Sequence, residues 1–179
     1  MAIIAKDYWN SRYIKGNSGY GSYGEQLEKK LHWLSGLDIK SISEIGCGDF
    51  NFGKNLLKQH PKASYVGYDI SEVIIERNKI LYPQHKFTNK FDLSLFNADL
   101  VLCVDVLFHV LDDNEYDILL LNLFHNYNKY LAITAYENEQ RASPHLKIRK
   151  FDYKKWGKPL MREVIEEDGQ LYFYLYARS

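Results

Sequence analysis

The sequence predicts one α/β domain built on a doubly wound sheet of about seven strands, with helices on both faces and an antiparallel last strand. Three observations favour this fold class. Short apolar runs alternate with helical patterns along the chain, as in βαβ units. Residues 98–104 are apolar apart from Asp99, as expected for a parallel strand covered on both faces. Residues 162–178 resemble two strands around Asp168-Gly169, a dipeptide typical of hairpin turns.

Apolar spacing and helix-breaking residues predict the elements in order. Residues 25–37 place leucines at 27, 31 and 34 on one helical face. Ser71 is a suitable N-cap for a helix that Pro83 ends, and Asp112 and Asp113 put negative charge where a helix dipole favours it. The expected helices are 25–37, 52–60, 71–81, 112–127 and 151–157, and the expected strands are 41–45, 64–70, 85–88, 98–104, 130–135, 162–167 and 170–178.

The composition limits the classes of function. The chain has 179 residues with 23 Lys and Arg against 23 Asp and Glu, and this balance argues against nucleic acid or an anionic membrane as the main partner. The longest apolar stretch, residues 100–111, is too short to cross a bilayer. The two cysteines form no disulfide scaffold, which predicts a reduced, cytoplasmic setting. The histidines lack metal-ligand spacing, so no metal site is expected.

A nucleoside-binding pattern follows the strand at 41–45. Gly46 and Gly48 turn the chain into a helix, where glycine lets the backbone approach a ligand and the helix start offers free N–H groups. Asp69 ends the next strand, in position to accept hydrogen bonds from two ribose hydroxyls. A dinucleotide fingerprint has a third glycine where this chain has Asn51, and Glu44 lies two residues before the first glycine.

These residues resemble the first motif of the class I S-adenosylmethionine-dependent methyltransferases, which is an acid, any residue, then Gly-x-Gly. Residues 105–110 resemble the family's Asp-x-Leu-x-His-Val segment, and the antiparallel last strand is typical of its Rossmann-like sheet. The resemblance covers residues 41–179 and implies S-adenosyl-L-methionine as cofactor, with S-adenosyl-L-homocysteine as product. The implied cofactor contacts are Glu44, Gly46, Cys47, Gly48, Asp69, Ile70, Asp105 and Val106, while Phe91 is expected either to stack on the adenine or to belong to the core.

The first 24 residues interleave aromatic residues with glycines and are predicted to form an ordered loop or lid, with an N-terminal arm packed on the body as the alternative. Trp9, Arg12 and Tyr13 resemble the W-x-x-R-(W/Y) element of thiopurine-type and Nod-factor-type small-molecule methyltransferases, which implies that they close over the cofactor or its acceptor. Arg12 is expected either to pair with a carboxylate or to be solvated. One methyltransferase domain is expected, with a lid over 1–24 and an α/β core over 25–179.

The acceptor is expected at the loops that follow the strands at 98–104 and 130–135, because ligands of such sheets bind at the carboxyl ends of the strands. His109 and His145 are candidate general bases there, with capping or packing as the alternative role of His109. Residues 141–158 hold seven Lys or Arg against one acid. Arg149 in this loop is expected to act on an anionic or polyhydroxylated acceptor, unless the loop is only a solvated surface.

The sequence therefore predicts in-line methyl transfer to oxygen or nitrogen of a small-molecule acceptor, such as a sugar or an anionic metabolite. Three alternatives stay open: an RNA methyltransferase that uses the basic loop, a cofactor-binding partner protein without activity, and a nicotinamide-linked oxidoreductase. The identity of the acceptor and the oligomeric state do not follow from the sequence.

Overall fold

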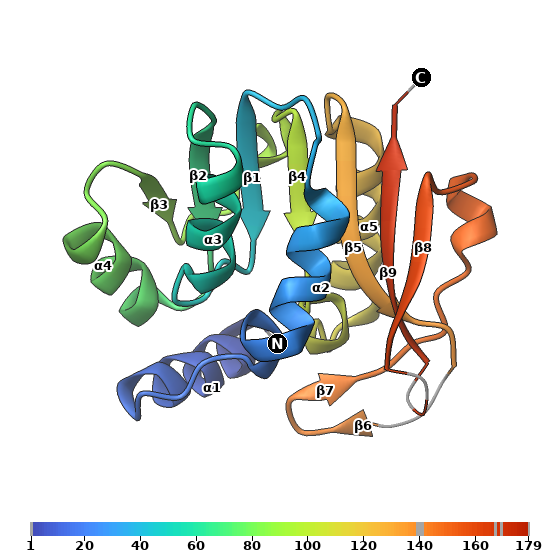
Figure 1. The fold of residues 1–179 in the computed structure, drawn as a ribbon. Helices are drawn as coiled ribbons and strands as arrows, with labels where there is room; N and C mark the ends of the chain where they lie inside the picture. Colours follow the sequence, from blue (N-terminus) through green and yellow to red (C-terminus); the bar gives the residue numbers. More distant parts are fainter. Residues whose placement is uncertain (1, 139–141, 167, 169, 179) are drawn as a thin grey trace.

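A seven-stranded sheet organises the computed structural model, which describes residues 2–138, 142–166, 168 and 170–178 (Figure 1). Its strands are β1 (Ser41–Ile45), β2 (Ser64–Tyr68), β3 (Lys86–Thr88), β4 (Leu100–Cys103), β5 (Tyr130–Tyr136), β8 (Met161–Glu166) and β9 (Leu171–Ala177), in the spatial order β3-β2-β1-β4-β5-β9-β8. The first five run parallel, and β9 is antiparallel to both β5 and β8. The predicted fold class is confirmed.

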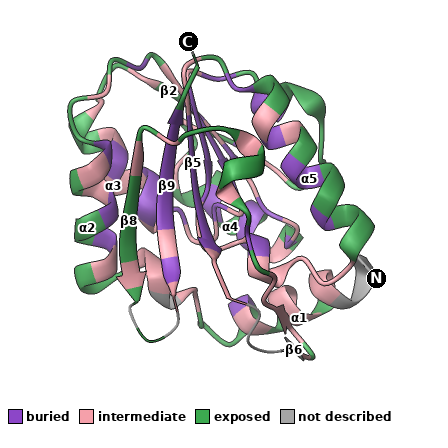
Figure 2. Ribbon diagram, turned by 90° about the vertical axis from the view of Figure 1, so that its right-hand side faces the viewer, coloured by how far each residue is buried: buried purple, intermediate pink, exposed green. Residues whose placement is uncertain are grey.

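Helices cover both faces of this sheet. They are α1 (Ala2–Ile14), α2 (Gly24–Leu34), α3 (Asn51–Gln59), α4 (Glu72–Leu81) and α5 (Asp113–Asn126), with 3₁₀ turns η1 (Tyr20–Ser22), η2 (Leu93–Phe96), η3 (Leu107–His109) and η4 (Tyr153–Trp156). Figure 2 shows α2 and α3 on one face and α5 on the other, with buried strands between them. None of the helices in the described part of the chain has the length and apolar character of a membrane span.

The core has one half on each face of the sheet, because neighbouring residues of the central strands point to opposite sides. Leu102 of β4 packs with the residues beneath α2 and α3, whereas Val101 and Cys103 pack beneath α5. Every residue of β4 is buried, which explains the apolar run in the sequence.

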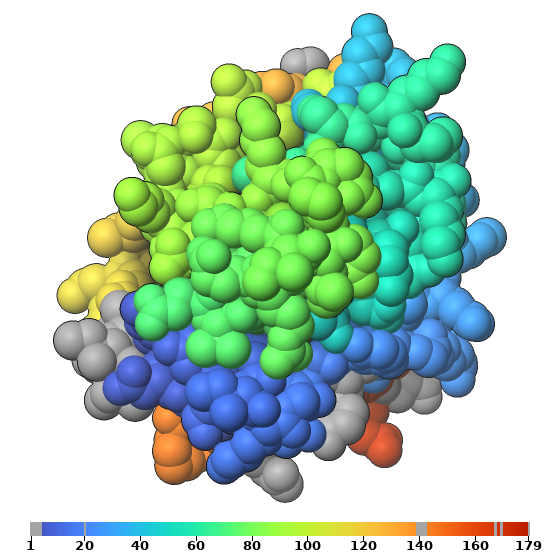
Figure 3. Space-filling model, turned by 90° about the vertical axis from the view of Figure 1, so that its left-hand side faces the viewer, coloured from blue at the N-terminus to red at the C-terminus, as the bar shows by residue number. Residues whose placement is uncertain are grey.

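The N-terminal segment differs from the predicted loop. It forms helix α1, because its glycines all lie beyond Ile14 and nothing within Ala2–Ile14 breaks a helix. The helix packs on α4, where Lys6 pairs with Glu72 at 2.9 Å and Arg77 donates a hydrogen bond to the Tyr13 carbonyl at 3.0 Å. Figure 3 shows the N-terminal segment against α4. Of the two structures expected for this segment, the N-terminal arm packed on the body agrees with the observed contact between α1 and α4.

Two further segments were predicted only in outline. The expected helix at 151–157 is the 3₁₀ turn η4, and the basic loop contains a small hairpin of β6 (Ala142–Ser143) and β7 (Leu146–Lys147) that the sequence analysis did not predict. β8 and β9 pair as predicted, whereas Gly169 of the expected Asp-Gly turn lies outside the described residues. In Figure 1 the hairpin and α1 lie near each other, below the carboxyl ends of the parallel strands.

Candidate active site

A cavity of about 600 Å³ lies at the carboxyl ends of the parallel strands, a volume typical of small-molecule and cofactor sites. Residues that end or follow four of the strands line it: Gly46 after β1, Asp69 after β2, Asp105 after β4 and Tyr136 at the end of β5. Helix α1 contributes Trp9 to the same wall. The cavity is therefore at the edge of the sheet where the sequence predicts the ligand.

The turn after β1 requires its glycines. Gly46 and Gly48 have φ of 77° and 50°, in the left-handed region that other residues rarely adopt. A Cβ atom on Gly46 would lie 2.3 Å from Cγ2 of Val106, so the backbone packs against the loop after β4 without room for a side chain. The amides of Gly46 and Cys47 both donate to the Tyr68 carbonyl, at 2.7 and 2.9 Å, which holds the turn against β2.

Asp69 connects this turn with α1. One carboxylate oxygen accepts a hydrogen bond from the Gly48 amide at 3.0 Å and the other from the Ser71 amide at 2.9 Å, and the Tyr13 hydroxyl donates a further bond. Burial raises the pKa of Asp69 to about 6, although these hydrogen bonds act in the opposite direction. Asp69 and Tyr13 both line the cavity.

Glu44 and Cys47 lie behind the turn and are not among the residues that line the cavity. The Glu44 carboxyl accepts hydrogen bonds from the Tyr65 hydroxyl at 2.5 Å and from the Gly53 amide in α3. Burial raises its pKa to about 8. Cys47 packs on Gly67, away from the cavity. The resemblance implies that Glu44 and Cys47 contact the cofactor. Their side chains instead lie behind the turn, where Glu44 holds α3 in position.

We expect Glu44→Gln to flatten the dependence of stability on pH. A group whose pKa is raised in the folded state stabilises it at low pH, so the wild-type free energy of unfolding should fall between pH 4.5 and about 8, by at most about 1.4 kcal/mol per pH unit. Glutamine is uncharged throughout and should remove that decline. Urea denaturation at several pH values measures it, with exposed Glu163→Gln as control. Parallel curves for Glu44→Gln and the wild type would contradict the assignment.

Asp105 is held by a buried lysine that the sequence analysis did not single out. Lys30 of α2 is 0% exposed, and its Nζ lies 2.5 Å from Oδ2 of Asp105 and donates to the Gly21 carbonyl at 3.1 Å. Thr134 of β5 accepts from the Asp105 amide at 2.6 Å and donates to Oδ1 at 3.1 Å. The sequence contains a signal for this buried pair, because Lys30 is a charged residue on the apolar helix face that Leu27 and Leu34 define.

His109 lines the cavity with a defined tautomer. Its Nδ1 is 3.0 Å from the His145 carbonyl, which can only accept, so Nδ1 carries the proton and Nε2 keeps its lone pair. Burial lowers the pKa of His109, which keeps the ring neutral near pH 7. Trp9 packs edge-to-face on this ring with centroids 4.9 Å apart. The His145 ring instead stacks on Tyr8 at 4.7 Å and is not among the cavity-lining residues.

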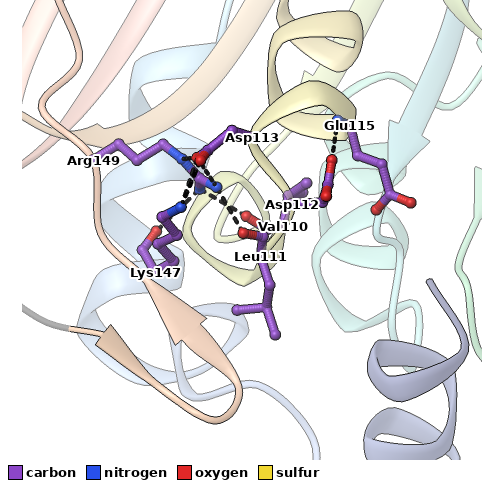
Figure 4. Close-up of polar contacts among 7 residues, drawn as sticks. All are labelled: Val110, Leu111, Asp112, Asp113, Glu115, Lys147 and Arg149. Carbon is purple, nitrogen blue, oxygen red and sulfur yellow. Dashed lines mark hydrogen bonds and ion pairs between the residues drawn. The ribbon is translucent and has the colours of Figure 1, made fainter. Parts of the chain in front are cut away.

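Arg149 and Lys147 hold the loop after β4 and the start of α5 (Figure 4). Neither residue lines the large cavity. Arg149 donates to the carbonyls of Val110 and Leu111, at 2.7 and 2.9 Å, and to the Asp113 carboxylate at 2.9 Å. Lys147 pairs with the same carboxylate at 2.7 Å. Both cations thus join the basic loop to the start of α5. The sequence predicts that Arg149 acts on the acceptor, but in the structure Arg149 does not line the cavity.

The remaining predicted residues separate into two groups. Ile70, Phe91 and Val106 line the cavity, and Phe91 is 46% exposed, which excludes the alternative that it belongs to the core. Arg12 does not line it. Its guanidinium donates to the Tyr8 hydroxyl at 3.3 Å and to the Ser18 carbonyl at 3.1 Å, without a carboxylate partner in the described part of the chain.

Among the described residues, no three His, Cys, Asp or Glu side chains gather as a metal ion requires.

The known proteins that this chain resembles are methyltransferases. Residues 43–129 match a family model described as a methyltransferase domain, and no curated protein matches the sequence. Magnesium protoporphyrin IX methyltransferase from Synechocystis, solved with bound S-adenosylmethionine, shares the fold with a TM-score of 0.71 and 20% identity over 99% of this chain and 97% of that chain. The N-methyltransferase NodS from Bradyrhizobium japonicum, in complex with S-adenosylhomocysteine, has a TM-score of 0.71 and 15% identity over 97% and 98%.

A third solved structure is 1,6-didemethyltoxoflavin-N1-methyltransferase from Burkholderia thailandensis, with a TM-score of 0.70 and 12% identity over 99% of this chain and 88% of that chain. These likenesses show a shared fold along nearly the whole chain, and the family match includes the Gly46–Gly48 turn and Asp69. Both findings agree with the resemblance carried by the sequence motifs. Residues 43–129 therefore match a methyltransferase domain, and nearly the whole chain has the fold of methyltransferases solved with S-adenosylmethionine or S-adenosylhomocysteine.

Proposed function

We propose that this protein transfers a methyl group to an oxygen or nitrogen atom of a small-molecule acceptor. The observation that carries the proposal is that the Gly46–Gly48 turn, Asp69 and His109 line one cavity. S-adenosylmethionine, when bound, supplies an electrophilic methyl group on its sulfonium and leaves as S-adenosylhomocysteine after in-line displacement. The protein contributes mainly by holding the two reactants in line, which can supply a large part of the rate.

The cofactor residues are assigned from their chemistry and position. Gly46 and Gly48 let the backbone approach a ligand, and the Asp69 carboxylate is the acceptor for two ribose hydroxyls. Each carboxylate oxygen has two lone pairs, so the bonds from Gly48, Ser71 and Tyr13 leave room for one ribose hydroxyl, and the second ribose hydroxyl would replace Tyr13 as a donor. Phe91, with its exposed ring at the cavity wall, is assigned to the adenine.

Helix α1 is proposed as the lid of a single methyltransferase domain, with residues 25–179 as the core. Trp9 and Tyr13 face the cavity from this helix, and Tyr8 stacks on His145 in the turn of the β6–β7 hairpin. Contacts with Asp69 on one side and with the hairpin on the other support a cover that encloses both reactants. Excluding water in this way strengthens the electrostatic interactions inside a site.

His109 is the proposed general base, and we expect His109→Gln to lower transfer to a hydroxyl acceptor by about 10²–10⁴-fold. Because burial lowers the pKa of His109, wild-type activity should decline only below pH 6.5, as Nε2 becomes protonated. The variant should lack this acidic limb and bind S-adenosylhomocysteine normally. Rates measured against pH test both points, with exposed His125→Gln as control. An unchanged pH profile would assign His109 to packing alone.

The decisive experiment uses S-adenosylmethionine that carries a trideuterated methyl group. The protein is incubated with it and with a small-molecule extract, and mass spectrometry searches for products heavier by that group. A protein-dependent labelled metabolite supports the proposal. Binding of S-adenosylhomocysteine without transfer would favour a non-catalytic partner protein, and preferential binding of NAD would favour an oxidoreductase. Labelled RNA, bound with a steep salt dependence that charge reversal of Lys147 and Arg149 removes, would favour the RNA alternative.

A further inference from the structure

The cavity has an end remote from Asp69, formed by Gln26, Phe108, Tyr136 and Glu166 and called here the acceptor end. Asp69 follows β2 and Glu166 ends β8, and these strands are five positions apart in the sheet. We propose that this end binds an amine in its cationic form, an inference that rests on the proposed methyl transfer and names its substrate class.

The charges that line the cavity are one-sided. Among the described residues, Asp and Glu but neither Lys nor Arg line it, with His109 as the basic side chain. Several of these acids are already engaged: Asp69 accepts hydrogen bonds from amides, Asp105 pairs with Lys30, and Asp112 caps α5. An anionic acceptor would meet these carboxylates, since Lys147 and Arg149 are bound to Asp113 outside the cavity.

Glu166 is the carboxylate at the acceptor end. The Gln26 amide donates a hydrogen bond to it at 2.9 Å, and no Lys or Arg of the described chain lies within ion-pair distance of it. A neutral partner leaves its charge uncompensated, so an ammonium group that approaches gains a charge-assisted hydrogen bond. Glu166 is exposed to solvent at the cavity wall, so desolvation costs less here than for a buried carboxylate.

Two aromatic rings complete the acceptor end. Phe108 and Tyr136 pack edge-to-face with centroids 5.3 Å apart, and both line the cavity. Burial raises the pKa of the Tyr136 hydroxyl, and the charges of Glu166 and Asp105 raise it further, in keeping with a carboxylate near this ring. Aromatic faces attract cations, so the rings and Glu166 favour the same ligand: an organic amine with apolar carbon beside the charged nitrogen.

The chemistry of transfer is consistent with the groups present. The bound ammonium gives one proton to Nε2 of His109, which frees the nitrogen lone pair. That lone pair forms the new N–C bond to the methyl group while the C–S bond breaks, and the electron pair of the C–S bond stays on sulfur. The proton on His109 then passes to solvent. The amine thus arrives as the cation that Glu166 attracts and reacts as the neutral nucleophile.

The test compares three probes that share a benzyl or phenyl group and differ in charge: benzylamine, benzyl alcohol and benzoate. Their binding to the protein saturated with S-adenosylhomocysteine is measured by calorimetry and ligand-observed NMR. Benzylamine should bind at least about tenfold more tightly than benzoate, and Glu166→Gln should weaken benzylamine about tenfold with unchanged affinity for S-adenosylhomocysteine. Glu163→Gln, on the same strand and not among the cavity-lining residues, is the matched control and should change neither affinity.

Several outcomes would overturn the inference: tighter binding of benzoate, benzylamine binding that Glu166→Gln leaves unchanged, or an equal loss in Glu163→Gln. Failure of the proposed function can be distinguished from failure of this inference. It would be seen before any probe is added, because the protein would then not bind S-adenosylhomocysteine. In that case the three probes are compared on the protein alone, where the same order of affinities is expected. Far-UV circular dichroism confirms that each variant is folded.

Discussion

Replacing Lys30 with methionine is expected to lower the free energy of unfolding by about 3 kcal/mol, near the lower end for removal of one partner of a buried ion pair. Methionine fills similar space, so the loss comes from charge. Asp105 would lose its cation, and the Gly21 carbonyl would lose its donor. The lower end of the range is appropriate because the Asp105 side chain is 20% exposed and can recruit water.

Urea denaturation measures this effect, and Lys29→Met is the matched control one residue earlier. Lys29 pairs with Glu25 on the surface, where such pairs contribute about 0–1 kcal/mol. The double variant Lys30→Met/Asp105→Asn should lose less than the sum of the two single losses, because it removes both charges together. Equal losses in Lys29→Met and Lys30→Met, or strict additivity in the double variant, would show that the buried pair is not coupled.

The second large effect is on binding. Asp69→Ala is expected to weaken S-adenosylhomocysteine by about 10²–10⁴-fold, because two hydrogen bonds to a charged group contribute about 1.5–3 kcal/mol each. The same change removes the acceptor that the amides of Gly48 and Ser71 share, so the glycine turn also loses its order. Both effects act in the same direction.

Calorimetry measures this loss, and Asp38→Ala serves as control because that side chain is 89% exposed and does not line the cavity. Asp69→Asn keeps the size of the side chain and one acceptor oxygen, so an intermediate affinity is expected. A folded Asp69→Ala protein that binds S-adenosylhomocysteine as tightly as the wild type would refute the assignment of Asp69 to the ribose.

Local pattern was sufficient for most of the fold. Ser71 caps α4 as its sequence position predicts, accepting a hydrogen bond from the Ile74 amide, and Asp112 caps α5 through the Glu115 amide. Both depend on residues within four positions of each other, which a sequence displays directly. The segment before residue 24 was predicted as a loop because its glycines were considered together with Ala2–Ile14, which contains none and forms a helix.

In the site, too, residues placed by local sequence patterns were predictable, whereas residues placed by long-range contacts were not. Gly46, Gly48 and Asp69 belong to a strand-turn-helix pattern and the strand that follows it, and their place at the cavity was predictable. Arg149 was not, since its partner Asp113 lies 36 residues earlier and charge alone does not reveal which carboxylate a cation meets. Glu166 likewise enters the cavity only because β8 pairs with β9 and β9 with β5.

The buried pair beneath Gly21 has a consequence for how this sequence can change over evolutionary time. A Cβ atom on Gly21 would lie 1.8 Å from Oδ2 of Asp105 and 3.0 Å from Nζ of Lys30. No side chain fits at position 21 while Asp105 keeps its place, and Lys30 and Thr134 together hold Asp105 there. A side chain at position 21 is therefore disfavoured until Asp105 has changed, and a change of Asp105 leaves the buried Lys30 without its carboxylate, so the three positions should change together rather than singly.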